Sequence, residues 1–200
     1  MCLMRPLPVV LLLVLVGCDD RSSPTGAPST PMNAATAPAG MNKYPYLAAD
    51  GGPHMLLPSG AAGVDYSRAC ALTANAQMAL MPIGSVSAMI LADPPMTAWG
   101  TSADGWVEVY YLKSWTGMNL DALVAKASAA LPTSSMTDSG QVFRLAQADA
   151  FLLFAGDTPT SSAYGVHRVT IPAGTYTILT GTFSAAGESV TIYRLKPAGT

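Results

Sequence analysis

The residues that could do chemistry are few and lie far apart in the chain. Cys70 could serve as a thiol nucleophile, which needs a nearby base, and His54 and His167 are the candidates for that base. No local thiol-protease signature surrounds Cys70. The segment 68–72 is interpreted as a buried strand, in which cysteine behaves as a small hydrophobe. We therefore favour a packing role for Cys70.

Other reactive groupings are equally sparse. Carboxylate pairs support glycoside hydrolysis, but nothing in the sequence brings two together, so turn and surface roles are predicted for Asp93, Asp104, Glu108 and Asp157. Metal ligation by nitrogen or sulfur needs a cluster of His and Cys, which two distant histidines and one cysteine do not form. His167 alternates with Val169 and Ile171, which favours a half-buried structural histidine. No phosphate-binding loop or hydrolase elbow is present. We expect no enzyme, no metal and no cofactor.

Aromatic residues gather in one short stretch. Trp99, Trp106 and Trp115 lie close together in the chain, with Tyr110 between the last two. Trp and Tyr carry much of the binding energy at protein interfaces, but they also fill cores. Trp115 is expected in the core. For Trp99 and Trp106, a role in binding a partner and a role in core packing both stay open. Tyr110 is a candidate partner contact.

Arg68 presents a similar choice. On a strand it would share a face with Tyr66 and Cys70, and would be partly buried. A buried arginine needs a carboxylate partner, and Asp65 and Asp93 are the candidates. Arg68 is therefore interpreted as a structural clamp, with recognition of a partner as the alternative.

The elements that must position these residues are mostly strands. Apolar residues recur at helical spacing over 119–131, where Asn119 can cap the start and Pro132 ends the helix. Strands are predicted over 44–48, 54–57, 68–72, 77–83, 86–92, 106–113, 141–145, 150–154, 166–171, 175–180 and 189–195. The sequence thus predicts an α+β fold, predominantly antiparallel β, with one clear amphipathic helix.

Three of the predicted strands carry more specific expectations. The segments 77–83 and 86–92 are apolar on both faces, so they are expected in the middle of a sheet, covered on both sides. In 106–113, Val107, Val109 and Tyr111 alternate with Trp106, Glu108 and Tyr110, which is typical of a strand with two different faces.

The amino-terminal residues indicate export. Arg5 precedes the apolar run 9–16, which is too short to span a bilayer as a helix. The run ends at Gly17-Cys18, and this arrangement resembles a bacterial lipoprotein signal. The resemblance implies cleavage between Gly17 and Cys18, lipid on Cys18, and a domain facing the periplasm from the inner or outer membrane of the cell envelope.

The rest of the chain divides into two parts. Residues 18–42 are rich in Pro, Ser, Thr, Ala and Gly, which is typical of a disordered tether. Residues 43–200 suffice for one globular domain, either undivided or in two lobes, 43–133 and 134–200. The formal net charge of −2 leaves no basic surface for nucleic acid, so no nucleic-acid partner is expected.

Several short motifs occur in a fixed order in this domain. They are Gly51-Gly52-Pro53, Leu56-Leu57-Pro58, Asp65-Tyr66-Ser67-Arg68-Ala69-Cys70-Ala71, Leu91-Ala92-Asp93-Pro94-Pro95 with Trp99, Pro172-Ala173-Gly174-Thr175-Tyr176 and Tyr193-Arg194-Leu195. Together they resemble immunity protein family twenty-one of the bacterial polymorphic toxin systems. The run from Asp65 to Ala71 is the most specific piece.

This resemblance implies a non-enzymatic inhibitor that binds a cognate toxin protein. A lipoprotein leader is not a general feature of the family, so its presence implies protection outside the cytoplasm. The alternative is an envelope lipoprotein that binds a glycan, a peptide or an assembly partner through the aromatic strand 106–111. The sequence leaves the oligomeric state open.

Overall fold

The computed structural model describes residues 44–48, 51–114 and 119–199. The predicted leader, Cys18, the tether and Trp115 lie outside these residues. In chain order the elements are β1 (Tyr46–Leu47), β2 (His54–Pro58), α1 (Tyr66–Thr73), β3 (Met78–Ile83), β4 (Val86–Leu91), β5 (Met96–Thr101), β6 (Val107–Ser114), α2 (Leu120–Ala130), the 3₁₀ turn η1 (Thr133–Ser135), β7 (Thr137–Leu145), β8 (Ala150–Phe154), β9 (Val166–Val169), β10 (Gly174–Ala185) and β11 (Glu188–Pro197). None of the helices in this part of the chain is long and apolar enough to cross a membrane.

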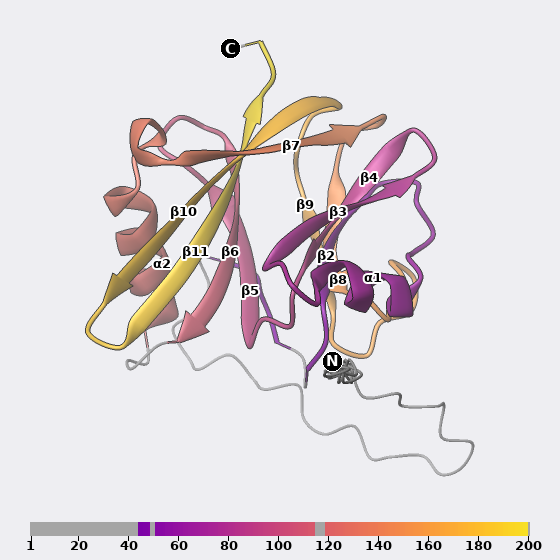
Figure 1. Ribbon diagram of the computed structural model, residues 1–200, viewed down its shortest axis with the longest axis horizontal. Coiled ribbons are helices and arrows are strands. Elements are labelled where there is room, and N and C mark those ends of the chain that lie inside the picture. The colour runs from indigo at the N-terminus through magenta and orange to yellow at the C-terminus, as the bar shows by residue number, and fades with distance from the viewer. Residues whose placement is uncertain (1–43, 49–50, 115–118, 200) are drawn as a thin grey trace, which may run out of the picture.

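The strands form two sheets that pack face to face (Figure 1). The six-stranded sheet has the order β1-β5-β6-β11-β10-β7, and the five-stranded sheet has the order β3-β4-β2-β8-β9. Neighbouring strands pair antiparallel throughout, as the sequence predicts. Each sheet draws strands from both 43–133 and 134–200, so a division at residue 133 does not separate the two sheets.

The largest apolar cluster lies between the sheets. Val107, Val109 and Tyr111 project from β6 towards Leu56 on β2 and Leu152 on β8. The predicted alternation in β6 is confirmed, because Tyr110 and Leu112 belong to a separate cluster on the opposite face. That opposite face is covered rather than exposed, since α2 packs against it.

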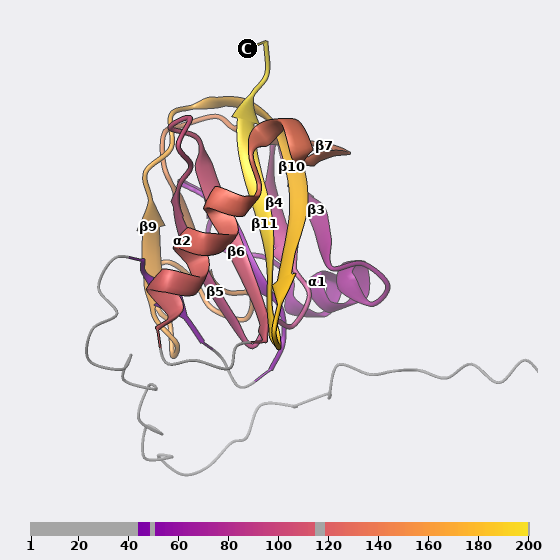
Figure 2. The same ribbon diagram turned by 90° about the vertical axis from the view of Figure 1, so that its left-hand side faces the viewer.

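Helix α2 forms where the sequence predicts a helix. The Asn119 side chain caps it by accepting a hydrogen bond from the Ala122 amide at 2.9 Å. Its buried residues, Leu120, Leu123, Val124 and Ala127, follow helical spacing. Figure 2 shows α2 lying across the outer face of the six-stranded sheet. The helix therefore places its carboxyl-terminal end beside β6 and β11.

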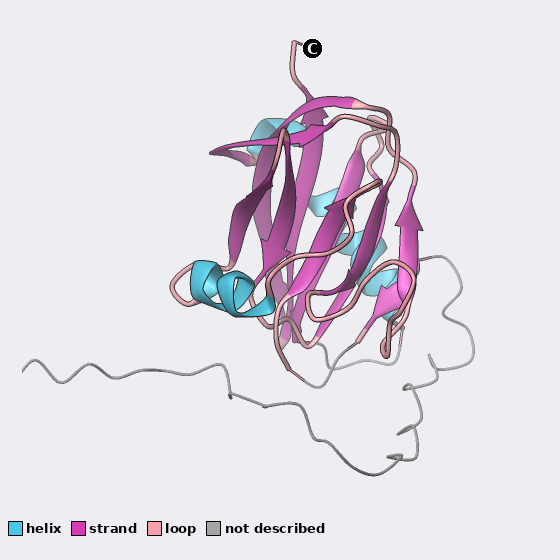
Figure 3. Ribbon diagram, turned by 90° about the vertical axis from the view of Figure 1, so that its right-hand side faces the viewer, coloured by secondary structure: helices cyan, strands magenta, loops and turns pink. Residues whose placement is uncertain are grey.

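A second helix replaces one predicted strand. Residues 68–72 lie in α1, so the prediction of a strand there is wrong, and the described residues contain two α-helices rather than one. Asp65 caps α1 by accepting a hydrogen bond from the Arg68 amide at 2.7 Å, and Ala69, Cys70 and Thr73 form its buried face. Ala, Arg and Leu are good helix formers, which the strand interpretation neglected. Figure 3 shows α1 beside the five-stranded sheet.

Two further differences concern the strands. β3 is an edge strand with partly exposed residues, so its predicted central position is wrong, whereas β4 lies inside the sheet. The strand that carries Trp99, β5, was not predicted, because Gly100 and two prolines before it suggest a loop. The predicted strands after α2 are present as β7 to β11.

Candidate functional site

A buried ion pair lies beneath α2, on the face of the six-stranded sheet that the helix covers. Glu108 on β6 and Arg194 on β11 are direct cross-strand neighbours. Arg194 is 2% exposed and Glu108 is 0% exposed. The Nε of Arg194 donates to Oε1 of Glu108 at 2.8 Å, and Nη2 donates to the same oxygen. Two charges taken out of water in this way are tolerated because each neutralises the other.

The second carboxylate oxygen of Glu108 is also occupied. Its Oε2 accepts hydrogen bonds from the Tyr110 hydroxyl and the Ser128 hydroxyl, both at 2.7 Å. Burial, and then the neighbouring Glu108 carboxylate, raise the pKa of Tyr110, so its phenol keeps the proton that it donates. With two donors on each oxygen, the four lone-pair positions of the Glu108 carboxylate are all used and the side chain is held in place.

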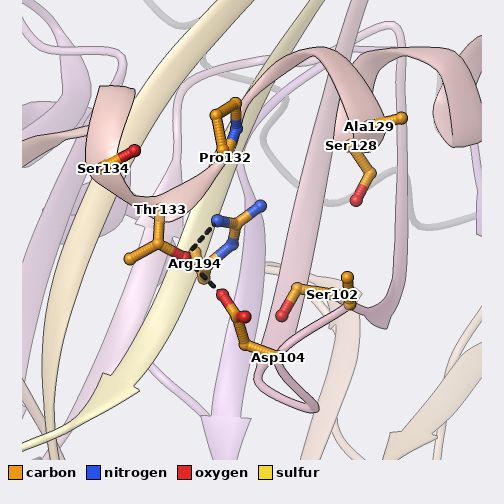
Figure 4. A pocket seen from close by; sticks show the side chains of 9 residues that line it. Ser102, Asp104, Ser128, Ala129, Pro132, Thr133, Ser134 and Arg194 are labelled. Atoms are coloured by element: carbon orange, nitrogen blue, oxygen red, sulfur yellow. Dashed lines mark hydrogen bonds between the residues drawn. The ribbon is translucent and has the colours of Figure 1, made fainter.

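Further hydrogen bonds connect this pair to the surface (Figure 4). Arg194 donates from Nη2 to the Leu131 carbonyl at 2.9 Å and from Nη1 to the Thr133 hydroxyl oxygen at 2.7 Å. The Thr133 hydroxyl then donates to Oδ2 of Asp104 at 2.6 Å. Asp104 is exposed, in the turn between β5 and β6. One continuous network thus leads from Glu108 in the interior to Asp104 at the surface.

A pocket of about 340 Å³ opens where this network reaches the surface. Side chains of β11, α2, η1 and the β5–β6 turn line it: Ser102, Ala103, Asp104, Ser128, Ala129, Pro132, Thr133, Ser134 and Arg194. The lining contains hydroxyls, one exposed carboxylate and one paired guanidinium, but no histidine or cysteine. This arrangement can recognise a polar group through hydrogen bonds and charge. The Asp104 carboxylate is the charged group of this lining that solvent reaches.

The sequence did not reveal this site. Turn and surface roles were predicted for Asp104 and Glu108, and the prediction is wrong for Glu108, which is fully buried. The structure connects these two carboxylates through Thr133 and Arg194. The usable signal was a charged residue of opposite sign in each of two otherwise apolar strand segments, 107–112 and 190–195.

Several motif residues meet in a second region, here called the corner cluster: Gly52, His54, Tyr66, Asp93 and Phe154. Oδ1 of Asp93 accepts a hydrogen bond from the Gly52 amide at 2.6 Å. The Tyr66 and Phe154 ring centroids lie 5.6 Å apart. A Cβ added at Gly52 would lie 2.5 Å from the Tyr66 hydroxyl oxygen, so glycine is required there. The structure therefore brings together Tyr66 and Asp93, which lie far apart in sequence.

His54 forms the buried part of the corner cluster. Its Nδ1 lies 2.8 Å from the Thr97 hydroxyl oxygen, which joins β2 of one sheet to β5 of the other. Its Nε2 is buried with no hydrogen-bond partner in the described part of the chain. Burial lowers the pKa of His54 to about 4, so the ring is neutral near pH 7.

The predicted roles of Asp65 and Arg68 need correction. Asp65 is the amino-terminal cap of α1, and its contact with Arg68 involves the backbone amide only. The Arg68 residue is exposed, so the prediction of a partly buried clamp is wrong. The reason is geometric, because a helix turns residue 68 away from the face that carries Ala69 and Cys70. Arg68 remains a residue that a partner could reach.

The aromatic candidates have different environments. Tyr110 is 0% exposed beneath α2, so its predicted contact with a partner is wrong. Trp99 packs against the cluster between the sheets, and its Nε1 is buried without a hydrogen-bond partner among the described residues. Trp106 is half-buried, and Nζ of Lys196 lies 5.6 Å from its ring centroid. The aromatic strand therefore does not present a binding face.

The remaining reactive residues have structural environments. Nε2 of His167 lies 2.9 Å from the Tyr46 carbonyl oxygen, which joins β9 to β1, and this half-buried position confirms the sequence interpretation. Cys70 is buried on α1. Within residues 44–48, 51–114 and 119–199, no group of three or more His, Cys, Asp or Glu side chains could hold a metal ion. In comparisons with family models, curated proteins and solved structures, none matched this chain.

Proposed function

We propose that this protein is a membrane-anchored immunity protein, which neutralises a cognate toxin protein by binding it in the cell envelope. The motifs from Gly51 to Trp99 support the toxin as the partner through their resemblance to immunity protein family twenty-one. In this proposal the protein is not an enzyme and needs no cofactor. Its action depends on occupying a surface of the toxin.

The observation that carries this proposal is the buried, fully hydrogen-bonded Glu108 carboxylate beneath the pocket. Glu108 accepts four hydrogen bonds, and Arg194 and Thr133 are held by the same network. General acid–base catalysis needs a group that can gain or lose a proton at the reacting atom. Groups held in this way favour recognition by a rigid surface, which is what an inhibitor needs.

The membrane anchor is proposed on the leader alone. Lipid on Cys18 would hold the domain at the membrane, and the 18–42 tether would let it reach a partner. Changing Cys18→Ser is expected to abolish metabolic labelling with a fatty acid and to release the protein from the membrane fraction. A Cys70→Ser variant serves as the matched control and should stay labelled. Persistent membrane partition of the Cys18→Ser variant would contradict lipid anchoring.

The toxin proposal is tested with the protein encoded by a toxin-like gene next to this one. Cells that export that toxin to the periplasm should die without this protein and survive when the full-length chain is expressed. The purified toxin and this protein should elute together in size-exclusion chromatography. An unrelated exported toxin is the control and should kill in both cases. If no complex forms, and cells without this protein survive the toxin, the proposal is wrong.

An envelope module for a glycan or a peptide is the second candidate. The aromatic strand no longer supports it, because Tyr110 and Tyr111 are buried. The hydroxyls of Ser102, Ser128 and Thr133 in the pocket are the observation that favours it. Retention of the full-length chain on cell-wall or glycan resins, without a toxin-like neighbouring gene, would support this candidate over the first.

A further inference from the structure

The accessible charge in the pocket belongs to Asp104. Arg194 also lines the pocket, but it is 2% exposed and two of its nitrogens donate to Glu108. The charge of the Arg194 guanidinium is therefore already neutralised by Glu108 when a ligand enters the pocket. Asp104 uses Oδ2 to accept from Thr133, and its Oδ1 has no hydrogen-bond partner among the described residues. An incoming group therefore meets a negative charge with one available oxygen.

The network also fixes the position of this carboxylate. An exposed aspartate in a turn before glycine normally samples several rotamers, and a ligand must then offset the entropy of ordering it. Here the Thr133 hydroxyl holds Asp104, Arg194 holds Thr133, and the buried Glu108 holds Arg194. The buried ion pair thus acts through Thr133 to orient a surface carboxylate in advance.

We propose that this pocket receives a cationic side chain, lysine or arginine, from the protein partner. The inference rests on the proposed function, and it names the chemistry by which the partner is recognised. A cation pairs with Asp104 Oδ1 and can donate further hydrogen bonds to the hydroxyl oxygens of Ser102 and Ser134 in the lining. An anion would instead meet the Asp104 carboxylate, while the guanidinium of Arg194 is already paired.

The size of the pocket agrees with one inserted side chain. Sites for drug-sized ligands occupy about 300–1,000 Å³, and this pocket of about 340 Å³ lies at the small end. Interface residues that contribute most to affinity are enriched in tryptophan, tyrosine and arginine, and they often fill a pocket on the partner. A single long basic side chain can enter a pocket of this volume.

The first test uses small ions in place of the partner. Methylguanidinium chloride is titrated into the ¹⁵N-labelled full-length chain in detergent micelles, and sodium acetate at equal ionic strength is the comparison. We expect saturable amide shifts at the pocket with methylguanidinium and none with acetate. Asp104→Asn should weaken this binding about fivefold, the size of one exposed charge pair. Stronger binding of acetate, or no saturable shift with methylguanidinium, would overturn the inference.

A matched variant separates this effect from net charge. Asp65→Asn also removes one exposed negative charge, and asparagine caps a helix as well as aspartate does. Asp65 caps α1, and α1 lies on the opposite side of the molecule from α2 (Figure 1). This variant should bind methylguanidinium as the parent chain does. If Asp65→Asn and Asp104→Asn weaken methylguanidinium binding equally, the effect is one of net charge, and the inference of a cation-binding pocket is overturned.

The second test uses the toxin and distinguishes the two proposals. Asp104→Asn should weaken the toxin complex about fivefold or more, while Asp65→Asn leaves it unchanged. A toxin complex that is insensitive to Asp104→Asn would overturn the pocket inference but leave toxin neutralisation standing. Methylguanidinium binding without any toxin complex would leave the pocket as a cation site and overturn the proposed function.

Discussion

Two regions of this protein bury polar groups, and they do so by different physical means. In the network beneath α2, the charges of Glu108 and Arg194 remain and are paired. In the corner cluster, His54 is buried with no charged partner among the described residues, and it remains neutral because burial lowers its pKa to about 4. The paired Glu108 and Arg194 belong to a hydrogen-bond network that continues to the surface, whereas the neutral His54 ring only packs between the sheets.

The same difference distinguishes the candidate binding site from the corner cluster, where several motif residues lie. Most of the motif residues of the corner cluster have structural roles: Asp93 holds the Gly52 turn and Tyr66 packs on Phe154. The network beneath α2 combines an exposed carboxylate, an oriented hydroxyl and a pocket. This contrast supports the proposal that the pocket recognises the partner, while the corner cluster stabilises the packing of the two sheets.

The largest expected effect comes from breaking the buried pair. Arg194→Met leaves Glu108 buried and unpaired, which should lower the free energy of unfolding by about 3–5 kcal/mol. Replacing both residues, Glu108→Leu with Arg194→Met, should cost less than Arg194→Met alone, because no buried charge is left over. Urea unfolding of the three chains measures this.

A milder variant tests the same pair if Arg194→Met does not fold. Tyr110→Phe removes one donor to Glu108 and should cost about 1–3 kcal/mol. A cost of less than about 0.5 kcal/mol would contradict the view that each donor to this carboxylate is needed.

The corner cluster should make stability depend on pH. His54 has an ordinary pKa of 6.5 and a pKa of about 4 in the folded protein, so the unfolded chain binds more protons between these values. The contribution of His54 is therefore fully present above about pH 6.5 and is lost as the pH falls through 4. The loss should reach about 3 kcal/mol. Urea unfolding of the parent chain and of His54→Phe, compared across this range, measures it. An equal slope in both chains would contradict the neutral buried histidine.

The next largest loss of stability is expected from crowding at Gly52. Gly52→Ala would place a Cβ 2.5 Å from the Tyr66 hydroxyl at φ +100°, so it should cost about 1–3 kcal/mol. Gly165→Ala is the matched control, because Gly165 has φ +102° and no atom of the described residues lies within 4 Å of its added Cβ. Thermal unfolding should show the larger loss for Gly52→Ala. Equal losses would mean that the contact with Tyr66 is unimportant.

An exposed ion pair should contribute least. Arg168 donates to Asp149 on the five-stranded sheet, but the Arg168 side chain is 71% exposed. Asparagine, like aspartate, tolerates the positive φ of residue 149. Asp149→Asn should therefore lower the free energy of unfolding by less than about 1 kcal/mol. The difference should shrink in high salt. A cost equal to that of breaking Glu108–Arg194 would remove the distinction between buried and exposed pairs.

The sequence predicted the elements better than their surroundings. Periodicity and caps identified α2 and most strands, because these signals are local. The pattern could not reveal that Tyr110 lies under α2, since a strand with two different faces can have either face covered. It also missed α1, where a single cap residue, Asp65, was the evidence against a strand. The pocket depends on β6 pairing with β11, and such long-range pairing has no local signal.

Binding and turnover of the toxin can be measured together, which tests toxin neutralisation most directly. The toxin is titrated into the full-length chain by calorimetry, and its mass is then determined by mass spectrometry. We predict a saturable complex that Asp104→Asn weakens, with the mass of the toxin unchanged. A toxin that is cleaved or modified by this protein, or a titration without binding, would contradict neutralisation by binding.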